Sequence, residues 1–409
     1  MAYGNVMVGQ SGGPTSVINA SLVGVFKTAK DNGCKTVYGM RNGIEGLLEE
    51  RYIDISEYIK NDLDIELLKR TPSSFLGTCR YKLPSAEKAP ELYDRIFGIL
   101  NGLDVKYFFY IGGNDSMDTI MQLSNYGRKI GSDIRFMGVP KTIDNDLALT
   151  DHTPGYGSAA KYIATAMKEI IRDARTYPNE SITVVEIMGR NAGWLTAAAA
   201  LSRSEDCAGP DLIYLPEKIF DHDKFLEQVK QAKKKNRAVI IAVSEGVKTA
   251  DGKYVCEANK KSSITDAFGH KLLGGTALYL SDFLTDKLGV KSRGIVFSTL
   301  QRCASHLVSR RDITEAFMAG ADAMRAALNG ESGKMIVFNR ISNNPYSIVT
   351  DIMDINLIAN KEKTVPDEWI INDGTYVSSE FEVYARPLII GELSPFMVDG
   401  LPRHLFIDK

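Results

Sequence analysis

VKYFFYIGGNDS, residues 105–116, is the stretch that decides the expected fold. The run VKYFFYI at 105–111 is rich in aromatic and β-branched residues, which favours a β-strand. Gly112 and Gly113 follow, and helical periodicity begins at Ser116. A buried strand that ends in a glycine-rich loop and leads into a helix is the repeating unit of parallel, doubly wound α/β sheets.

The same alternation runs along most of the chain. The apolar strand VIIAV at 239–243 fits a parallel sheet, because strands of such sheets are buried on both faces. Strands are expected at 5–8, 36–40, 105–111, 134–139, 182–187, 212–215, 238–243, 294–297 and 335–338. Helices are expected at 17–30, 116–126, 158–175, 194–204, 222–236 and 313–328.

One sheet would need too many strands, so the sequence predicts two doubly wound, Rossmann-like α/β domains with the active site in the cleft between them. The polar stretch 145–153, followed by Pro154 and Gly155, marks a boundary. The first domain is expected to span 1–150 with part of about 300–325. The second is expected to span 151–299 with the C-terminal residues 326–409.

Composition excludes several classes of protein. The 409 residues are 44% hydrophobic and 24% charged, with 49 basic and 51 acidic residues and a net charge of −2. The basic run 233–235 is expected to end a solvated helix, so neither nucleic acid nor a membrane surface is an expected partner. No long apolar segment or secretory signal is visible. The five scattered cysteines indicate reduced thiols and a cytoplasmic protein, and no zinc motif is present.

Four polar, glycine-rich segments follow expected strands: GQSGGPTS at 9–16, IGGNDS at 111–116, VPKTIDND at 139–146 and EIMGRNAG at 186–193. Ligands of such folds bind at the carboxyl ends of strands.

GQSGGPTS suits a phosphate cradle at the start of a helix, although a structural turn is an alternative. It lacks the GK[ST] of a P-loop, and it matches the G-x-S-x-G nucleophile elbow of hydrolases without the strands that normally precede it. GYGSAA at 155–160 matches a dinucleotide pattern, but no strand precedes it.

The segment PKTIDND at 140–146 is the most informative of these. It places Asp144 and Asp146 beside Lys141 at the end of a strand. Phosphoryl transfer requires a carboxylate to accept the hydroxyl proton, a carboxylate near Mg²⁺ and a cation on the transferring group. An exposed acidic loop is the simpler alternative. Asp115, in the preceding segment, is expected to cap its helix or lie near a metal.

Several charged side chains at other strand ends indicate a sugar-phosphate pocket. Arg190 and Glu245 end two strands, and Arg293 and Arg302 flank a third. Arginine offers phosphate a planar fork of donors, and glutamate accepts hydrogen bonds from sugar hydroxyls.

The segments GGPTSVIN, GGNDS, PKTIDNDL, MGRNAGWL, SEG and LQR resemble, in order and spacing, the phosphofructokinase family over about residues 4–330. The resemblance implies phosphorylation of the 1-hydroxyl of fructose 6-phosphate, with Asp144 as the base. It assigns the sugar phosphate to Thr142, Met188, Gly189, Arg190, Glu245, Arg293, Thr299 and Arg302, with Arg293 reaching across a subunit interface of a homodimer or homotetramer. It assigns the donor to Gly12, Gly13, Gly113 and Lys141, and Mg²⁺ to the region of Asn114 and Asp146.

Two positions resemble the branch of the family that uses pyrophosphate. Asp115 and Lys141 stand where ATP-using members have glycine, and both are expected to act in the catalytic centre with Asp144. A carboxylate at 115 would repel the α-phosphate of ATP, and Lys141 would stabilise the charge on the departing phosphate. An ATP-dependent phosphofructokinase, a nicotinamide-dependent oxidoreductase and a non-catalytic sugar-phosphate sensor are the alternatives.

The chain also departs from the family pattern. Asn114 replaces a metal-binding aspartate of many members, and Ser181 replaces a second arginine that crosses between subunits. Thr299 replaces a histidine, and Cys303-Ala304 replaces a glycine pair. These differences concern the metal ligands and the grip on the 6-phosphate.

Overall fold

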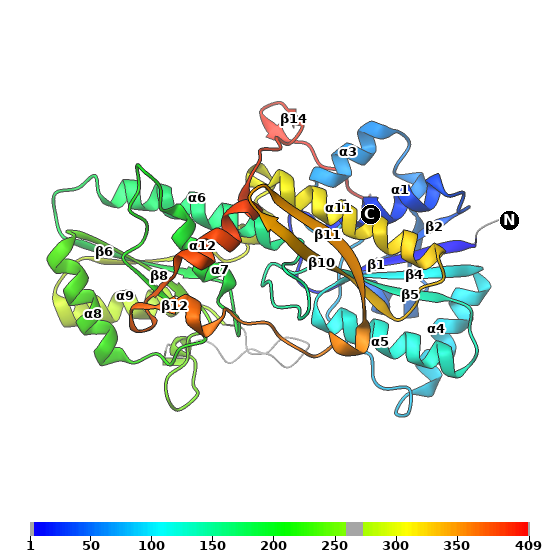
Figure 1. The fold of residues 1–409 in the computed structure, drawn as a ribbon, viewed down its shortest axis with the longest axis horizontal. Helices are drawn as coiled ribbons and strands as arrows, with labels where there is room; N and C mark the ends of the chain where they lie inside the picture. Colours follow the sequence, from blue (N-terminus) through cyan, green and yellow to red (C-terminus); the bar gives the residue numbers. More distant parts are fainter. Residues whose placement is uncertain (1–3, 259–272, 408–409) are drawn as a thin grey trace.

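The computed structural model describes residues 4–258 and 273–407, which form two α/β units side by side (Figure 1). One unit is built on a seven-stranded sheet of order β11-β10-β5-β4-β1-β2-β3, and the other on a four-stranded sheet of order β7-β8-β6-β9. The expected class, two doubly wound α/β domains, is confirmed. In the described ranges no helix has both the length and the apolar composition that crossing a membrane requires.

In the first sheet, strands β1, β2, β4 and β5 are parallel, and β3 is antiparallel to β2. Successive residues of β4 face opposite sides: Phe108 packs with α4 and α5, whereas Phe109 packs with α1 and α11. This is why the mixed aromatic run at 105–111 is almost wholly buried.

The strands are β1 (Asn5–Gln10), β2 (Val37–Met40), β3 (Tyr52–Asp54), β4 (Val105–Gly112), β5 (Arg135–Pro140), β10 (Lys334–Asn343) and β11 (Tyr346–Asp354). The helices are α1 (Ile18–Asp31), α2 (Gly43–Leu48), α3 (Asp62–Arg70), α4 (Pro90–Gly102), α5 (Asn114–Lys129) and α11 (Arg310–Leu328).

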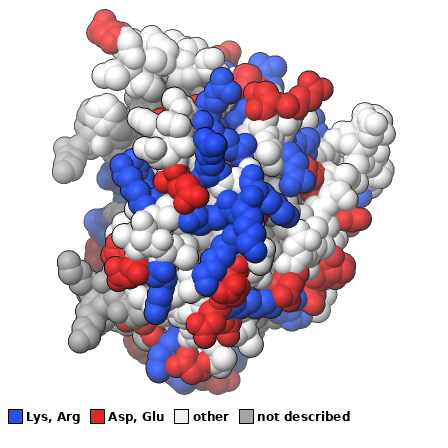
Figure 2. Space-filling view, turned by 90° about the vertical axis from the view of Figure 1, so that its left-hand side faces the viewer, with Lys and Arg blue, Asp and Glu red and all other residues white. Residues whose placement is uncertain are grey.

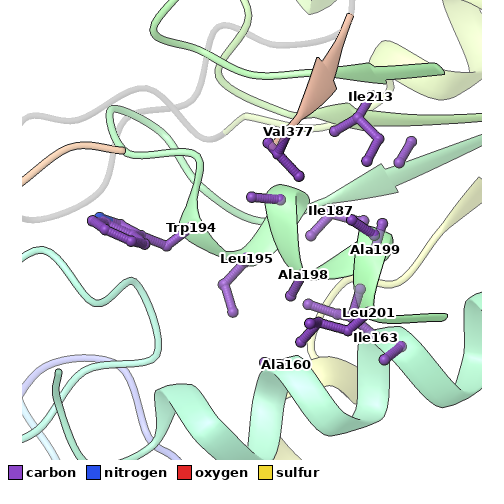
Figure 3. Close-up of a cluster of buried hydrophobic side chains, with 14 of the residues drawn as sticks. Ala160, Ile163, Ile187, Trp194, Leu195, Ala198, Ala199, Leu201, Ile213 and Val377 are labelled. Atoms are coloured by element: carbon purple, nitrogen blue, oxygen red, sulfur yellow. The ribbon is translucent and has the colours of Figure 1, made fainter. Parts of the chain in front are cut away.

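In the second sheet all four strands are parallel. Figure 3 shows the core on one of its faces, where Ala160 and Ile163 of α6 lie near Leu201 of the helical segment that follows β6. Helices α8 and α9 cover the other face. The strands are β6 (Ser181–Ile187), β7 (Leu212–Tyr214), β8 (Ala238–Ser244) and β9 (Ser292–Val296); the helices are α6 (Tyr156–Ala174), α7 (Trp194–Ala197), α8 (His222–Lys235), α9 (Thr276–Leu288), α10 (Leu300–Cys303) and α12 (Ser379–Ala385). Short hairpins pair β12 (Ile370–Ile371) with β13 (Tyr376–Val377), and β14 (Met397–Val398) with β15 (Leu401–Pro402).

Every expected strand is present, and the expected helices differ mainly at one place. The helix expected over 194–204 is four residues of α-helix, α7, continued as a 3₁₀ turn over Ala198–Ser202. The sequence did not predict β3, β11, α2, α3, α4, α9, α10, α12 or the short strands β12 to β15. Of these, α4 carries a recognisable start signal, because Pro90 occupies its first turn.

The C-terminal part of the chain lies partly in a different unit from the one expected. Residues 326–409 were expected in the second domain, yet β10 extends the first sheet by pairing in parallel with β5, and β11 pairs antiparallel with β10. The physical reason is burial: Ile336 and Phe338 fill one core cluster of this sheet, and Met335 and Val337 fill the other. Only after Ala359 does the chain cross to the second unit, where Phe381 and Leu388 join its core.

Candidate active site

A cleft of ≈ 610 Å³ lies where the carboxyl ends of strands from both sheets meet. It is lined by the loops after β1, β4, β5, β6 and β8. Thirteen of the sixteen residues expected in the site line this cleft: Gly12, Gly13, Gly113, Asn114, Asp115, Lys141, Thr142, Asp144, Asp146, Met188, Arg190, Glu245 and Arg302. Gly189, Arg293 and Thr299 are not among the lining residues.

Lys141 is buried at the base of the cleft, 2% exposed. Its backbone continues the sheet, because its N–H donates to the carbonyl of Gly112 at 3.0 Å. Its ammonium donates to the carbonyl oxygens of Ser11 and Gly13, both at 2.7 Å. Burial lowers the pKa of Lys141 to about 7, against the opposing effect of Asp144. The two hydrogen bonds hold the ammonium next to the glycine-rich loop. Because the side chain is almost fully buried, water screens its charge only weakly.

The two aspartates of the TIDND segment reach the cleft because the residue between them points inward. Asn145 has left-handed backbone geometry, with φ 56°, which asparagine tolerates better than most residues. Its buried side chain donates to the hydroxyl of Tyr384 at 2.8 Å and accepts from the N–H of Thr153 at 3.1 Å. Asp144 and Asp146 on either side of it both line the cleft.

The carboxylates of the cleft are perturbed by burial and by one another. Burial raises the pKa of Asp144, although Lys141 and Arg190 oppose the shift. Burial and then the charge of Asp144 raise the pKa of Asp146 to about 7, and the same two causes raise that of Glu245 to about 7. A carboxylate with a raised pKa is a stronger proton acceptor than an ordinary one, which suits a general base near neutral pH.

The loop GQSGGPTS has its expected place in the fold but not its expected hydrogen bonding. The helix was expected to begin at position 17, and α1 begins one residue later, at Ile18. Free N–H groups for an anion were expected, but the N–H of Gly12 donates to the carbonyl of Cys79 at 3.3 Å. Gly12 has φ 75°, a conformation that favours glycine. The loop therefore presents the carbonyl oxygens of Ser11 and Gly13 to the ammonium of Lys141, which lines the cleft.

The loop after β4 is, as expected, a glycine-rich turn that leads directly into a helix. Helix α5 begins at Asn114, with Asp115 in its first turn, and no side chain caps its start. Gly112 has no room for a side chain, because an added Cβ would lie 1.9 Å from the hydroxyl of Ser116. The N-terminus of α5 thus opens directly onto the cleft, which favours a phosphate there.

The expected metal ligands are present, but they do not form a closed cage. The amide nitrogen of Asn114 donates to the carbonyl of Lys361 at 2.8 Å, while its side-chain oxygen is buried without a hydrogen-bond partner. Within 4–258 and 273–407, no group of three or more His, Cys, Asp or Glu side chains is arranged to hold a metal ion. The unsatisfied oxygen of Asn114 and the carboxylate of Asp146, which both line the cleft, are the kind of oxygen ligand that Mg²⁺ would take.

The second-sheet wall of the cleft is built by close packing of two strand ends. The N–H of Gly189 donates to a carboxylate oxygen of Glu245 at 3.4 Å. Gly246 must be glycine, because an added Cβ would lie 2.0 Å from the carbonyl of Arg190. Arg302 lies between the two walls: a Cβ on Gly13 would be 3.4 Å from its guanidinium. Gly189 thus holds Glu245 in place rather than lining the cleft itself.

Arg293 and Thr299 lie outside this cleft. Both are exposed, Arg293 on β9 at the open edge of the second sheet and Thr299 in the turn after it. Exposed apolar side chains lie nearby: Val296 and Leu300, close to them in the chain, are 37% and 57% exposed, and Leu278 of α9, the helix packed against β9, is 47% exposed.

The segments that match a dinucleotide-binding pattern and a nucleophile elbow have other roles in the structure. Asp312, 2% exposed, accepts hydrogen bonds from the N–H groups of Gly155 and Ser158 at 2.9 and 2.8 Å, so a carboxylate occupies the helix start where a dinucleotide would place its pyrophosphate. Ser11, the centre of the nucleophile-elbow match, is 4% exposed and is not among the residues that line the cleft.

The basic run at the end of α8 is solvated, as expected. Figure 2 looks onto the outer end of the second unit, where lysine and arginine side chains gather with acidic ones between them. Lys233 pairs with Glu180 at 3.0 Å, and Lys234 and Lys235 are exposed. These charges lie at the amino ends of the strands, on the side away from the cleft.

The lining residues that the sequence did not predict include Arg80, Asn191, Asn360 and Glu362. Asn191 lies inside the MGRNAG segment, so its motif was a usable signal. The other three lie outside any expected helix or strand, and they reach the cleft only through the tertiary fold.

Comparison with known proteins identifies the family of this chain and similar structures. The pattern of the family described as Phosphofructokinase matches residues 5–327. The pyrophosphate–fructose 6-phosphate 1-phosphotransferase of Halomonas elongata is 39% identical over 407 residues, which cover 98% of this chain and 96% of the relative. The enzyme of the same name from Methylococcus capsulatus is 39% identical over 409 residues, covering 99% and 96%. The crystal structure of a pyrophosphate-dependent phosphofructokinase from Nitrosospira multiformis superposes with a TM-score of 0.88 at 37% identity, covering 98% of this chain and 95% of that one.

Proposed function

Because the chain belongs to the phosphofructokinase family, we propose that it transfers a phosphoryl group from pyrophosphate to the 1-hydroxyl of fructose 6-phosphate. The products are fructose 1,6-bisphosphate and phosphate, and the reaction runs in both directions in glycolysis and gluconeogenesis. The observation that carries the choice of donor is the buried ammonium of Lys141 on the glycine-rich loop, in the cleft that Asp115 of the first turn of α5 also lines.

Asp144 is the general base of this proposal. Its carboxylate accepts the proton of the 1-hydroxyl as that oxygen attacks the nearer phosphorus of pyrophosphate. The bond from this phosphorus to the bridging oxygen breaks, and the second phosphate leaves with the bonding electrons. Burial keeps the pKa of Asp144 above its ordinary range, so the group that takes the proton is basic enough to hold it.

Lys141 acts on the leaving phosphate. Charge builds up on the bridging oxygen as the bond breaks, and a fixed cation in a dry site stabilises that charge without reorganising. Asp115 acts by exclusion, since a carboxylate in the first turn of α5 repels any further phosphate at that point. Gly12, Gly13 and Gly113 allow the donor to approach the backbone closely.

Mg²⁺ neutralises charge on the donor phosphates when it is bound. The side-chain oxygen of Asn114 and the carboxylate of Asp146 are the groups of this chain that we assign to it. The buried, unsatisfied oxygen of Asn114 supports this assignment.

The first unit binds the donor and the second binds the sugar phosphate in this scheme. Thr142, Met188, Glu245 and their neighbours hold the sugar, while Arg190 and Arg302 face the phosphates. Gly189 contributes by positioning Glu245.

The active enzyme is a homo-oligomer, with a homodimer as its smallest active unit. Arg293 is exposed on the edge strand β9, beside apolar side chains that a second copy would cover. That arrangement supports a 6-phosphate site completed by Arg293 and Thr299 of the adjoining subunit. All five cysteines carry free thiols, which fits a cytoplasmic enzyme.

A donor assay tests the function directly. The protein is incubated with fructose 6-phosphate, Mg²⁺ and either pyrophosphate or ATP, and fructose 1,6-bisphosphate is measured. Pyrophosphate should give the higher kcat/KM. A clear preference for ATP would overturn the assignment of the donor, and no product with either would overturn the proposed reaction.

A further inference from the structure

A segment of the C-terminal region runs from the first unit to the second (Figure 1), and its residues Asn360 and Glu362 line the cleft. We name residues 360–363 the strap. On one side Ile358 is buried in the core of the first sheet, and on the other Val365 is buried in the core of the second. The strap lies beyond the residues 5–327 that match the family.

The strap is attached to the donor wall of the cleft at two points on α5. The side-chain amide of Asn360 donates to a carboxylate oxygen of Asp118 at 2.9 Å. The side-chain amide of Asn114 donates to the carbonyl of Lys361 at 2.8 Å. These contacts lie on the first and second turns of α5, on either side of Asp115.

The other end of the strap is attached to the catalytic loop and to the second unit. The N–H of Lys363 donates to the carbonyl of Asp146 at 2.7 Å. The carboxylate of Glu362 accepts from the side-chain amide of Asn191 at 3.1 and 3.3 Å. Glu362 and Asn360 both line the cleft, so their side chains form part of its wall.

The position of the strap limits how long a donor can be. The phosphoryl group to be transferred must lie next to Asp144, and the leaving phosphate lies between Lys141 and the start of α5. Any group attached beyond it has to continue past Asp115 along the outside of α5. Asn360 bonds to Asp118 on that side of the cleft. Glu362 adds a negative charge to the opposite side, where it bonds to Asn191.

We propose that the strap is a second determinant of donor length, in which Asn360 closes the cleft beyond the second phosphate and the charge of Glu362 opposes further negative charge in the cleft. This inference rests on the proposed function. It differs from the effect of Asp115 because it is carried by a segment distant in sequence, and because it acts on any longer polyphosphate, with or without a nucleoside.

The test uses inorganic tripolyphosphate as a probe of length. Asn360→Gly removes the side chain without strain, because Asn360 already has φ 61°. Glu362→Gln removes the charge and keeps the shape. The matched control is Thr364→Ala, an exposed residue next to the strap. Each purified variant is examined for inhibition of the pyrophosphate reaction by tripolyphosphate, and for direct binding of tripolyphosphate by calorimetry.

In the double variant Asn360→Gly/Glu362→Gln, the affinity for tripolyphosphate relative to pyrophosphate should rise roughly tenfold, because one nearby charge and one steric barrier are removed. Thr364→Ala should change this ratio by less than about twofold, as is usual for an exposed side chain. A strap that only ties the two units together would lower the melting temperature without changing the ratio, and that result overturns the inference. If the double variant does not fold, Asn360→Gly alone is decisive, with an unchanged ratio again overturning it. Failure of wild type to use pyrophosphate would instead contradict the proposed function.

Discussion

The two walls of the cleft differ in how complete they are within one chain. The donor wall, from the first sheet, has its cation buried and hydrogen-bonded, and its helix start open to the cleft. The sugar wall, from the second sheet, has Glu245 and Arg190 in place, but Arg293 and Thr299 lie exposed on the outer edge of that sheet. We infer that phosphoryl transfer depends on groups that one subunit positions by itself. Binding of the sugar phosphate depends in addition on the association of two subunits.

Loss of the base should have the largest effect on the donor wall. Asp144→Asn removes the proton acceptor while keeping the shape of the side chain, so kcat should fall by roughly 10²–10⁴ with little change in KM. Steady-state kinetics in both reaction directions measures this loss. More than a tenth of wild-type kcat, with chemistry still limiting, would remove Asp144 from the role.

Loss of the buried cation should come next. Lys141→Met keeps much of the volume but removes the charge, and kcat with pyrophosphate should fall roughly 10²–10³-fold, the usual loss for one electrostatic stabiliser. Binding of fructose 6-phosphate should change little, because the sugar wall is left intact. An equal loss of sugar affinity would show that the two walls are not separable.

The cation also gives the donor wall a pH dependence. Because burial lowers the pKa of Lys141 to about 7, its positive charge is lost as pH rises through that value in the free enzyme. The value of kcat/KM for pyrophosphate should therefore fall on the alkaline side. Lys141→Arg should remove this decline from whatever activity the variant keeps, because arginine stays protonated. Wild type serves as the control for ionisation of the substrate, and a decline that persists unchanged in the variant assigns it to another group.

How much of this could be predicted depends on where the residues lie in the chain. Lys141, Asp144 and Glu245 directly follow buried strands, and a strand end fixes where its side chains go before any tertiary detail is known. Asn360 and Glu362 follow no periodic element, and their place in the cleft results from the chain crossing between two cores. The strand β11 was missed for a related reason: it is an edge strand with half its residues exposed, and it has no continuous apolar run.

Assembly can be tested on the sugar wall by subunit mixing. Arg293→Ala and Asp144→Ala should each be nearly inactive, the first through weak binding of fructose 6-phosphate. In a mixed dimer one site would have both groups intact, so equal mixing should restore about a quarter of wild-type activity by random pairing. Exchange is verified by mass spectrometry of tagged subunits. Verified exchange without any gain would place Arg293 and Asp144 in the same subunit's site, or Arg293 in none.

The smallest effect is expected from Asp115, because it excludes a ligand rather than stabilising a transition state. Asp115→Gly removes a carboxylate from the first turn of α5, where its charge opposes a third phosphate. Repulsion between this carboxylate and a nearby phosphate, when partly screened by water, should weaken the binding of ATP by roughly a factor of ten. ATP should then inhibit competitively against pyrophosphate about tenfold more strongly than in wild type. It should remain a poor donor, because Lys141 is placed for a diphosphate and the strap still closes the path beyond. Asp115→Asn is the matched control: it keeps the volume, so the difference between the two variants separates repulsion from crowding. If Asp115→Gly leaves ATP inhibition unchanged, donor selection belongs to Lys141 and the strap rather than to this carboxylate.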